Sequence, residues 1–186
     1  MSVRIKWLFA AASLAGVITA CNNEDPPTNG DNMKLNLTTT AFANGQPIPD
    51  RHAFDDDDLS PALRWSDVPP PTKSLALICD DPDAPMGTWV HWVIYDLPPT
   101  TAGLSEGVPK SPELANGAKQ GVNDYKRIGY GGPAPPPGKP HRYFFKLYAL
   151  DIKPDLKPGL AKKDLLKTME GHVLAEGQLM GTYQRK

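Results

Sequence analysis

Short apolar runs recur along the chain, and clusters of proline, glycine and aspartate bound each of them. The clearest runs are residues 34–40, 74–79, 89–97 and 141–151. Their content of Val, Ile, Leu, Tyr, Phe and Trp, together with the turn residues at their ends, predicts β-strands. The run that begins at Trp89 is apolar at both alternating sets of positions, which is typical of a strand inside a sandwich rather than at its edge.

One stretch has a helical pattern. Residues 162–170 place Leu165 and Met169 on one helical face, and Gly171 suits the left-handed position after a helix end. The pattern of residues 172–183 is ambiguous, with a strand favoured. We therefore predict one mostly-β domain, a two-sheet β-sandwich with a few short helices and long loops.

The N-terminal segment has the pattern of an export signal. A charged start precedes an apolar run of 14 residues, 7–20. A membrane-spanning helix needs about 20 apolar residues, so this run is too short to cross a bilayer, and residues 1–20 are predicted to be a signal peptide. Its end, Ile18-Thr19-Ala20-Cys21, is similar to a bacterial lipobox, in which the cysteine is acylated after cleavage. An ordinary cleaved signal that leaves Cys21 as a free thiol is the alternative.

Three parts follow from this pattern: the signal peptide, a lipidated Cys21 with a flexible tether over residues 21–32, and one folded domain over residues 33–186. The tether has no aliphatic or aromatic side chain after the cysteine, so it cannot offset the entropy cost of becoming ordered. Acylation anchors a protein to a membrane. We therefore expect the domain in a bacterial cell envelope, lipid-anchored and facing the periplasm or the exterior.

Charge and cysteine content narrow the choice of partners. The chain has a formal net charge of −1 and no basic stripe, which argues against nucleic acid as a partner. Cys79 is the one thiol in the predicted domain, so an internal disulfide is excluded. The neighbouring carboxylates of Asp80 and Asp81 are expected to keep this thiol protonated and slow to react.

The first candidate segment for a ligand site is Asp81-Pro82-Asp83-Ala84-Pro85, in which the restricted backbone around proline holds two carboxylates at a nearly fixed separation. His91 lies on the next predicted strand, where alternation places it on one face with Trp89 and Val93. A carboxylate beside an imidazole raises the pKa of the imidazole and orients its N–H, which suits capture of phosphate, sulfate or carboxylate. A core histidine with a purely structural role is the alternative.

The second candidate segment is His141-Arg142-Tyr143, at the start of a predicted strand. Alternation places His141 and Tyr143 on one face, where an imidazole and a phenol can donate hydrogen bonds into a cavity. Residues 131–140 just before them are rich in glycine and proline. The glycines permit close approach of a ligand to the backbone, and the prolines make a stiff wall. An exposed proline-rich linker is the alternative for this stretch.

Together these motifs resemble the phosphatidylethanolamine-binding protein family, and most closely its bacterial, Raf kinase inhibitor-like branch of the YbhB/YbcL type. The resemblance runs from about residue 37 to the end of the chain and also includes Ser60-Pro61-Ala62-Leu63-Arg64-Trp65 and Gly121-Val122-Asn123-Asp124-Tyr125. It implies a β-sandwich with an anion-binding cavity at one end, and a cis peptide bond between Ala84 and Pro85. It also implies that the cavity is lined by Asp81, Asp83, Pro85, His91, Gly132, His141 and Tyr143.

The resemblance implies a binding protein and not an enzyme, with no metal or organic cofactor. We expect a lipid-anchored protein that binds a small anion, such as phosphate or a phosphorylated headgroup, and binds it more tightly at pH 6 than at pH 8. Inhibition of a kinase or protease through the same surface and formation of a homodimer are left open. The main alternative is a metal-dependent hydrolase whose histidines and aspartates hold Zn or Fe. The sequence contains no His-x-x-x-His pair and no Gly-x-Ser-x-Gly elbow in support of it. A purely structural envelope protein is a third reading.

The sequence departs from the bacterial pattern at several positions. Phe54 and Ala134 stand where that branch leads us to expect cysteines, and Asp56 stands where a turn glycine is common. The loss of both cysteines argues against a redox role and leaves the shape of the pocket rim open. Residues 55–58 form an acidic run without the ligand spacing of a calcium loop, so we predict a solvated acidic loop.

Overall fold

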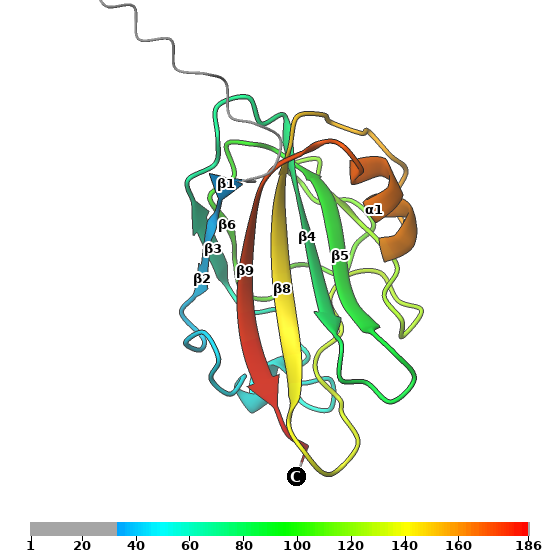
Figure 1. Ribbon diagram of the computed structural model, residues 1–186. Coiled ribbons are helices and arrows are strands. Elements are labelled where there is room, and N and C mark those ends of the chain that lie inside the picture. Colours follow the sequence, from blue (N-terminus) through cyan, green and yellow to red (C-terminus); the bar gives the residue numbers. More distant parts are fainter. Residues whose placement is uncertain (1–32, 186) are drawn as a thin grey trace, which may run out of the picture. The chain divides into compact units, whose positions relative to one another are not determined.

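The structure is a computed structural model that describes residues 33–185. Two β-sheets pack against each other in these residues (Figure 1). The larger sheet has the strand order β1-β9-β8-β4-β5-β7, with β1 (Met33–Lys34), β9 (Val173–Tyr183), β8 (His141–Leu150), β4 (Ser74–Asp81), β5 (Trp89–Leu97) and β7 (Lys119–Gln120). The smaller sheet consists of β2 (Asn36–Thr39), β3 (Leu63–Ser66) and β6 (Gly103–Leu104).

The predicted fold class is confirmed: a mostly-β domain of two sheets with few helices. β1 pairs with β9 in parallel, and the other neighbouring strands are antiparallel. Within residues 33–185 there is one α-helix, α1 (Lys162–Met169), and one short 3-10 helix, η1 (Asp50–His52). No helix in this part of the chain is long and apolar enough to cross a membrane. The predicted signal peptide (1–20), the lipidated Cys21 and the tether (21–32) lie outside the described residues.

The larger sheet is buried on both faces. Its inner face packs against the smaller sheet through side chains such as Trp92, Phe145 and Trp65. Its outer face packs against α1, where Val93 contacts the helix side with Leu165. Burial on two faces explains why β5 has no polar alternation, as its sequence predicted.

The helix end and the last strand also agree with the sequence. Gly171 follows α1 with φ +77°, the left-handed conformation predicted for it. The backbone N–H of His172 donates to the carbonyl of Met169 at 2.9 Å and closes the turn. The chain then enters β9, so the ambiguous stretch is a strand.

A β-bulge in β5 corrects one prediction about side-chain direction. Cys79 of β4 pairs with Trp92, but the next residue, Asp80, pairs with Val90, so His91 is the extra residue on β5. The bulge turns His91 to the inner face, where its ring meets Tyr143 edge-on with centroids 5.1 Å apart. The prediction that His91 shares a face with Val93 is therefore wrong.

Candidate functional site

A pocket of about 400 Å³ lies at the end of the larger sheet, where β4 ends and β5 and β8 begin. This is the end of the molecule at which the chain terminus is marked in Figure 1. The loop between β4 and β5 and the proline-rich segment before β8 close its sides. Five of the seven residues predicted for the cavity line it: Asp81, Pro85, His91, His141 and Tyr143. Two segments that are 50 residues apart in sequence therefore meet at one hollow.

Asp81 is the buried acid of the pocket and orients its neighbours. One carboxylate oxygen accepts a hydrogen bond from Nδ1 of His141 at 2.8 Å. The other accepts from the backbone N–H of Asp83 at 2.7 Å, which stiffens the turn that follows β4. Because Nδ1 of His141 is occupied, Nε2 is the ring nitrogen that remains for a ligand.

Asp83 does not line the pocket. Its carboxylate accepts hydrogen bonds from Nε of Arg142 at 2.9 Å and from Nη2 at 2.7 Å, and also from the backbone N–H of that arginine. The guanidinium lowers the pKa of Asp83 to about 2. Asp83 thus ties the β4–β5 loop to the start of β8 on the outer side of the sheet.

The loop also corrects an expectation about its backbone. Within residues 33–185 every peptide bond is trans, so the cis bond implied for Ala84–Pro85 is not present.

His91 is almost fully buried, at 2% exposure, and one of its nitrogens is fixed. Nδ1 lies 2.7 Å from the carbonyl oxygen of Gly131, and because a carbonyl can only accept, Nδ1 carries the proton. Burial is the largest influence on this ring and lowers its pKa below 6.5, although the nearby charges of Asp81 and Asp124 act in the opposite direction. The carboxylate of Asp81 therefore acts on this imidazole in the expected direction, but the net pKa of His91 is lowered because loss of solvation dominates.

Two hydrogen-bond donors of the pocket wall have no well-aligned acceptor. The hydroxyl of Tyr143 and the indole N–H of Trp89 are both buried and make no hydrogen bond of ordinary geometry within the described residues. Burial, followed by the charge of Asp81, raises the pKa of Tyr143 well above its usual value, so the phenol keeps its proton. A weak hydrogen bond from the Tyr143 hydroxyl to Asp81, outside ordinary hydrogen-bond geometry, acts in the same direction. A buried donor without a partner costs free energy, and a ligand with acceptor atoms would relieve that cost.

Gly132 also lies outside the pocket lining, and its role is to support the wall. Its N–H donates to Asp58 at 2.7 Å, and its carbonyl accepts from the hydroxyl of Tyr125 at 3.0 Å. A Cβ atom here would lie 2.6 Å from the nitrogen of Phe54 and still closer to the carbonyl of His52. The glycine is needed because another stretch of the chain runs against it, and not because a ligand approaches it.

Two aromatic residues of the pocket lining, Tyr125 and Trp89, were missed as site residues from the sequence. The Tyr125 ring lies edge-on to Trp89, with centroids 5.3 Å apart, and is stacked on Phe54 at 4.3 Å with an interplanar angle of 17°. Phe54 in turn lies beside the proline-rich wall, because its N–H donates to the carbonyl of Pro133 at 3.0 Å. The phenylalanine that replaces an expected cysteine therefore backs a wall of the pocket.

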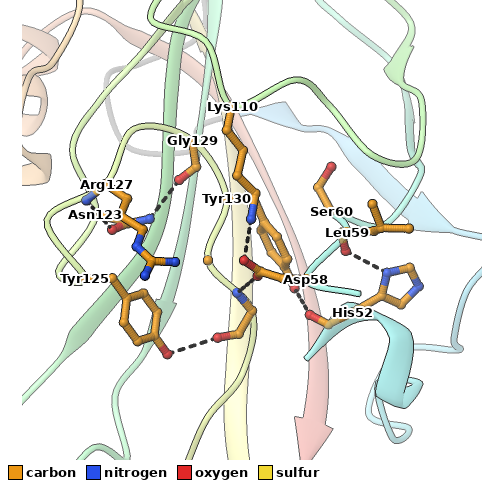
Figure 2. A network of polar contacts seen from close by, with 12 residues as sticks. His52, Asp58, Leu59, Ser60, Lys110, Asn123, Tyr125, Arg127, Gly129 and Tyr130 are labelled. Atoms are coloured by element: carbon orange, nitrogen blue, oxygen red, sulfur yellow. Dashed lines mark hydrogen bonds and ion pairs between the residues drawn. The ribbon is translucent and has the colours of Figure 1, made fainter. Parts of the chain in front are cut away.

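The acidic run 55–58 is only partly a solvated loop. Asp58 bonds to Gly132 and forms an ion pair with Lys110, as Figure 2 shows, and Asp55 pairs with Arg185 at 2.6 Å. The other two aspartates of the run are exposed, as predicted. The prediction is wrong for Asp58, because its carboxylate is the acceptor of a buried backbone N–H.

The remaining candidates for chemistry are poorly placed for it. Cys79 is buried in the core between the sheets, and burial raises its pKa more than the neighbouring carboxylates do. In residues 33–185 no three side chains of the His, Cys, Asp and Glu types gather in a way that would hold a metal ion. The two oxygens of Asp81 are already occupied, as described above.

Comparisons with known proteins show which family the chain resembles. Residues 38–184 match the family model described as phosphatidylethanolamine-binding protein. A UPF0098 protein of Methanothermobacter thermautotrophicus is 54% identical over 151 residues, which cover 81% of this chain and 99% of that protein. A UPF0098 protein of Aquifex aeolicus is 48% identical over 153 residues, covering 81% and 89%.

Two solved structures share the fold. One is a putative phosphatidylethanolamine-binding protein homologue from Chlamydia trachomatis, with a TM-score of 0.75 and 41% identity over 84% of this chain and all of that one. The other is E. coli YbcL, with a TM-score of 0.76 and 31% identity over 82% of this chain and 99% of that one. The matched family model and the closely related sequences together identify the chain as a member of the phosphatidylethanolamine-binding protein family.

Proposed function

We propose that this protein binds a small anion, phosphate or the phosphate of a phosphorylated headgroup, in the pocket between β4, β5 and β8. The observation that carries the proposal is a pair of buried donors at the pocket wall: Trp89 N–H has no acceptor, and Tyr143 O–H has only a poorly aligned one in Asp81. Oxygen atoms of an anion would accept a hydrogen bond from each of these two donors. His141 faces the same space and gains a second N–H donor and a positive charge when it is protonated.

The wider setting of this function is part of the same proposal. We place the chain in the Raf kinase inhibitor-like branch on the motifs quoted above, and its similarity to E. coli YbcL supports that placement. We infer a lipoprotein anchored through Cys21 in a bacterial cell envelope, facing the periplasm or the exterior. Inhibition of a kinase or protease would use the pocket rim, where Met86 is 97% exposed. Whether the domain forms a homodimer can be tested by measuring its molecular mass in solution.

We propose binding and not catalysis. A hydrolase that uses the histidines and aspartates would need them to share a metal ion or to flank a nucleophile. Asp83 is engaged by Arg142, each oxygen of Asp81 accepts a hydrogen bond from a neighbour, and Nδ1 of His91 is engaged by Gly131. These contacts leave the side chains as supports and hydrogen-bonding groups of a pocket. Stoichiometric Zn or Fe in the purified protein would favour the hydrolase instead.

Calorimetric titration with inorganic phosphate and with phosphoethanolamine tests the proposal. We expect weak binding that is stronger at pH 6 than at pH 8, because a protonated imidazole attracts anions. His141→Ala should remove most of the binding. His172→Ala is the matched control, because that histidine pairs with Asp151 on the surface and does not line the pocket. Equal binding by the His141 variant and the wild type would place the anion elsewhere.

A further inference from the structure

The pocket contains a hydrogen-bond acceptor that a bare anion cannot use. Nδ1 of His91 donates to Gly131, so the other ring nitrogen, Nε2, is the one that can meet a ligand in this pocket. In the neutral ring Nε2 carries a lone pair and accepts. Burial favours the neutral ring by lowering its pKa, against the backbone hydrogen bonds to Gly131 and Gly132 and the charges of Asp81 and Asp124. Tyr125 and Tyr143, whose rings pack edge-on against it, carry no charge.

The charge of the pocket also disfavours a highly charged ligand. Among the described residues that line it there is no lysine or arginine, and Asp81 contributes a buried negative charge. A dianion would meet that carboxylate with only His141 available to offset it. A ligand with a single negative charge and a proton of its own suits such a site better, because it repels less and donates one hydrogen bond.

We propose that the pocket selects oxyanions that carry a proton, above all phosphate monoesters in their monoanionic form, over sulfate esters and phosphodiesters. This inference rests on the anion-binding function proposed above. The ligand oxygens accept from Tyr143 and Trp89, and the P–OH group donates to Nε2 of His91. A sulfate ester or a phosphodiester of the same charge has no proton to donate, and it leaves the lone pair of His91 buried against an oxygen.

An ammonium ligand is the competing solution. The rings of Trp89 and Tyr125 and the carboxylate of Asp81 would attract a cation. A cation offers no acceptor, so the Trp89 N–H would remain unpaired and the Tyr143 hydroxyl would keep only its poorly aligned contact with Asp81. The two buried donors therefore favour the oxyanion.

Three probes isolate the proton: methyl phosphate, whose monoanion has the same charge as the other two, methyl sulfate and dimethyl phosphate, all titrated calorimetrically at pH 6. The second pKa of a phosphate monoester is about 6, so roughly half of the methyl phosphate is the protonated monoanion at that pH. We expect its affinity to exceed that of both other probes by about tenfold, the cost of an unpaired buried acceptor. At pH 8 the preference should vanish. Methyl sulfate does not titrate, so its pH dependence reports the protein's own protonation.

Each outcome is decisive. Equal affinity for the three probes overturns the selection of a proton and leaves the anion-binding function standing. No binding of any probe at either pH overturns both. Tighter binding of tetramethylammonium than of methyl phosphate assigns the pocket to cations and also overturns both.

Two variants that keep an aromatic ring separate the donors from the acceptor. His91→Phe removes the acceptor, so the affinity for methyl phosphate should fall about tenfold while the affinity for methyl sulfate changes much less. Tyr143→Phe removes a donor that every probe uses, so the affinities for all three probes should fall by the same factor. A uniform loss for the His91 variant would contradict the assigned role. If that variant does not fold, the ratio of the probes on the wild-type protein still decides the question.

Discussion

Removal of the Asp58 carboxylate tests whether the wall of the pocket is held from behind. Asp58 accepts the N–H of Gly132 at 2.7 Å and pairs with Lys110, and its side chain is 15% exposed. Asp58→Ala leaves the N–H of a buried glycine without an acceptor. Asp58 also has φ +54°, a left-handed conformation that aspartate and asparagine tolerate better than alanine.

The expected magnitude follows from these contacts. A hydrogen bond to a charged group contributes about 1.5–3 kcal/mol when its loss leaves a buried partner unsatisfied. The ion pair with Lys110 adds little, because that side chain is 40% exposed and solvent screens it. For a domain of this size each kcal/mol lowers Tm by about 2–4 °C, so Asp58→Ala should lower Tm by about 3–12 °C.

Differential scanning fluorimetry on three variants measures the effect. Asp58→Asn keeps an acceptor for Gly132 and loses only the ion pair, so its Tm should stay close to that of the wild type. Asp57→Ala controls for the loss of a negative charge in the same run, because Asp57 is exposed. If the Asp58→Ala and Asp57→Ala variants melt together, the hydrogen bond to Gly132 does not support the wall and the reasoning fails.

Two further predictions concern the loops around the pocket. Gly132→Ala places a methyl group 2.6 Å from the nitrogen of Phe54 and should destabilise the domain by about 3 kcal/mol in urea unfolding; an unchanged midpoint would contradict this packing. The charge of Asp83 stabilises the fold above its ordinary pKa of 3.8, and the contribution is lost as pH falls through about 2, because the protonated acid no longer pairs with Arg142. Carboxyl NMR should therefore show a midpoint near 2 in the wild type and near 3.8 in Arg142→Gln, and equal midpoints would refute the pairing.

Much of the sandwich could be predicted from the sequence because its long strands are apolar and end in turn residues. β4, β5 and β8 were found within two residues of their observed bounds. β6 and β7 were missed because two paired residues leave no pattern to detect. They exist through pairing with strands that are distant in sequence.

The site was predictable in its parts and less so in its assembly. Alternation correctly placed His141 and Tyr143 on one face, because β8 is regular there. It failed at His91, since a period of two assumes a strand without a bulge. Asp83 belongs to the same motif as Asp81, yet Arg142 draws its carboxylate away from the pocket. Local patterns cannot show which of two acids a distant arginine captures.

The extra residue in β5 sets a limit on how this protein can be engineered. Deleting one residue there, or choosing a sequence that favours a regular ladder, would strengthen the pairing with β4 and rotate the imidazole towards α1. A stabilised scaffold made in this way would keep its sheets and its core, but its pocket would lack the imidazole of His91. The irregularity is therefore a feature that any idealised redesign has to preserve.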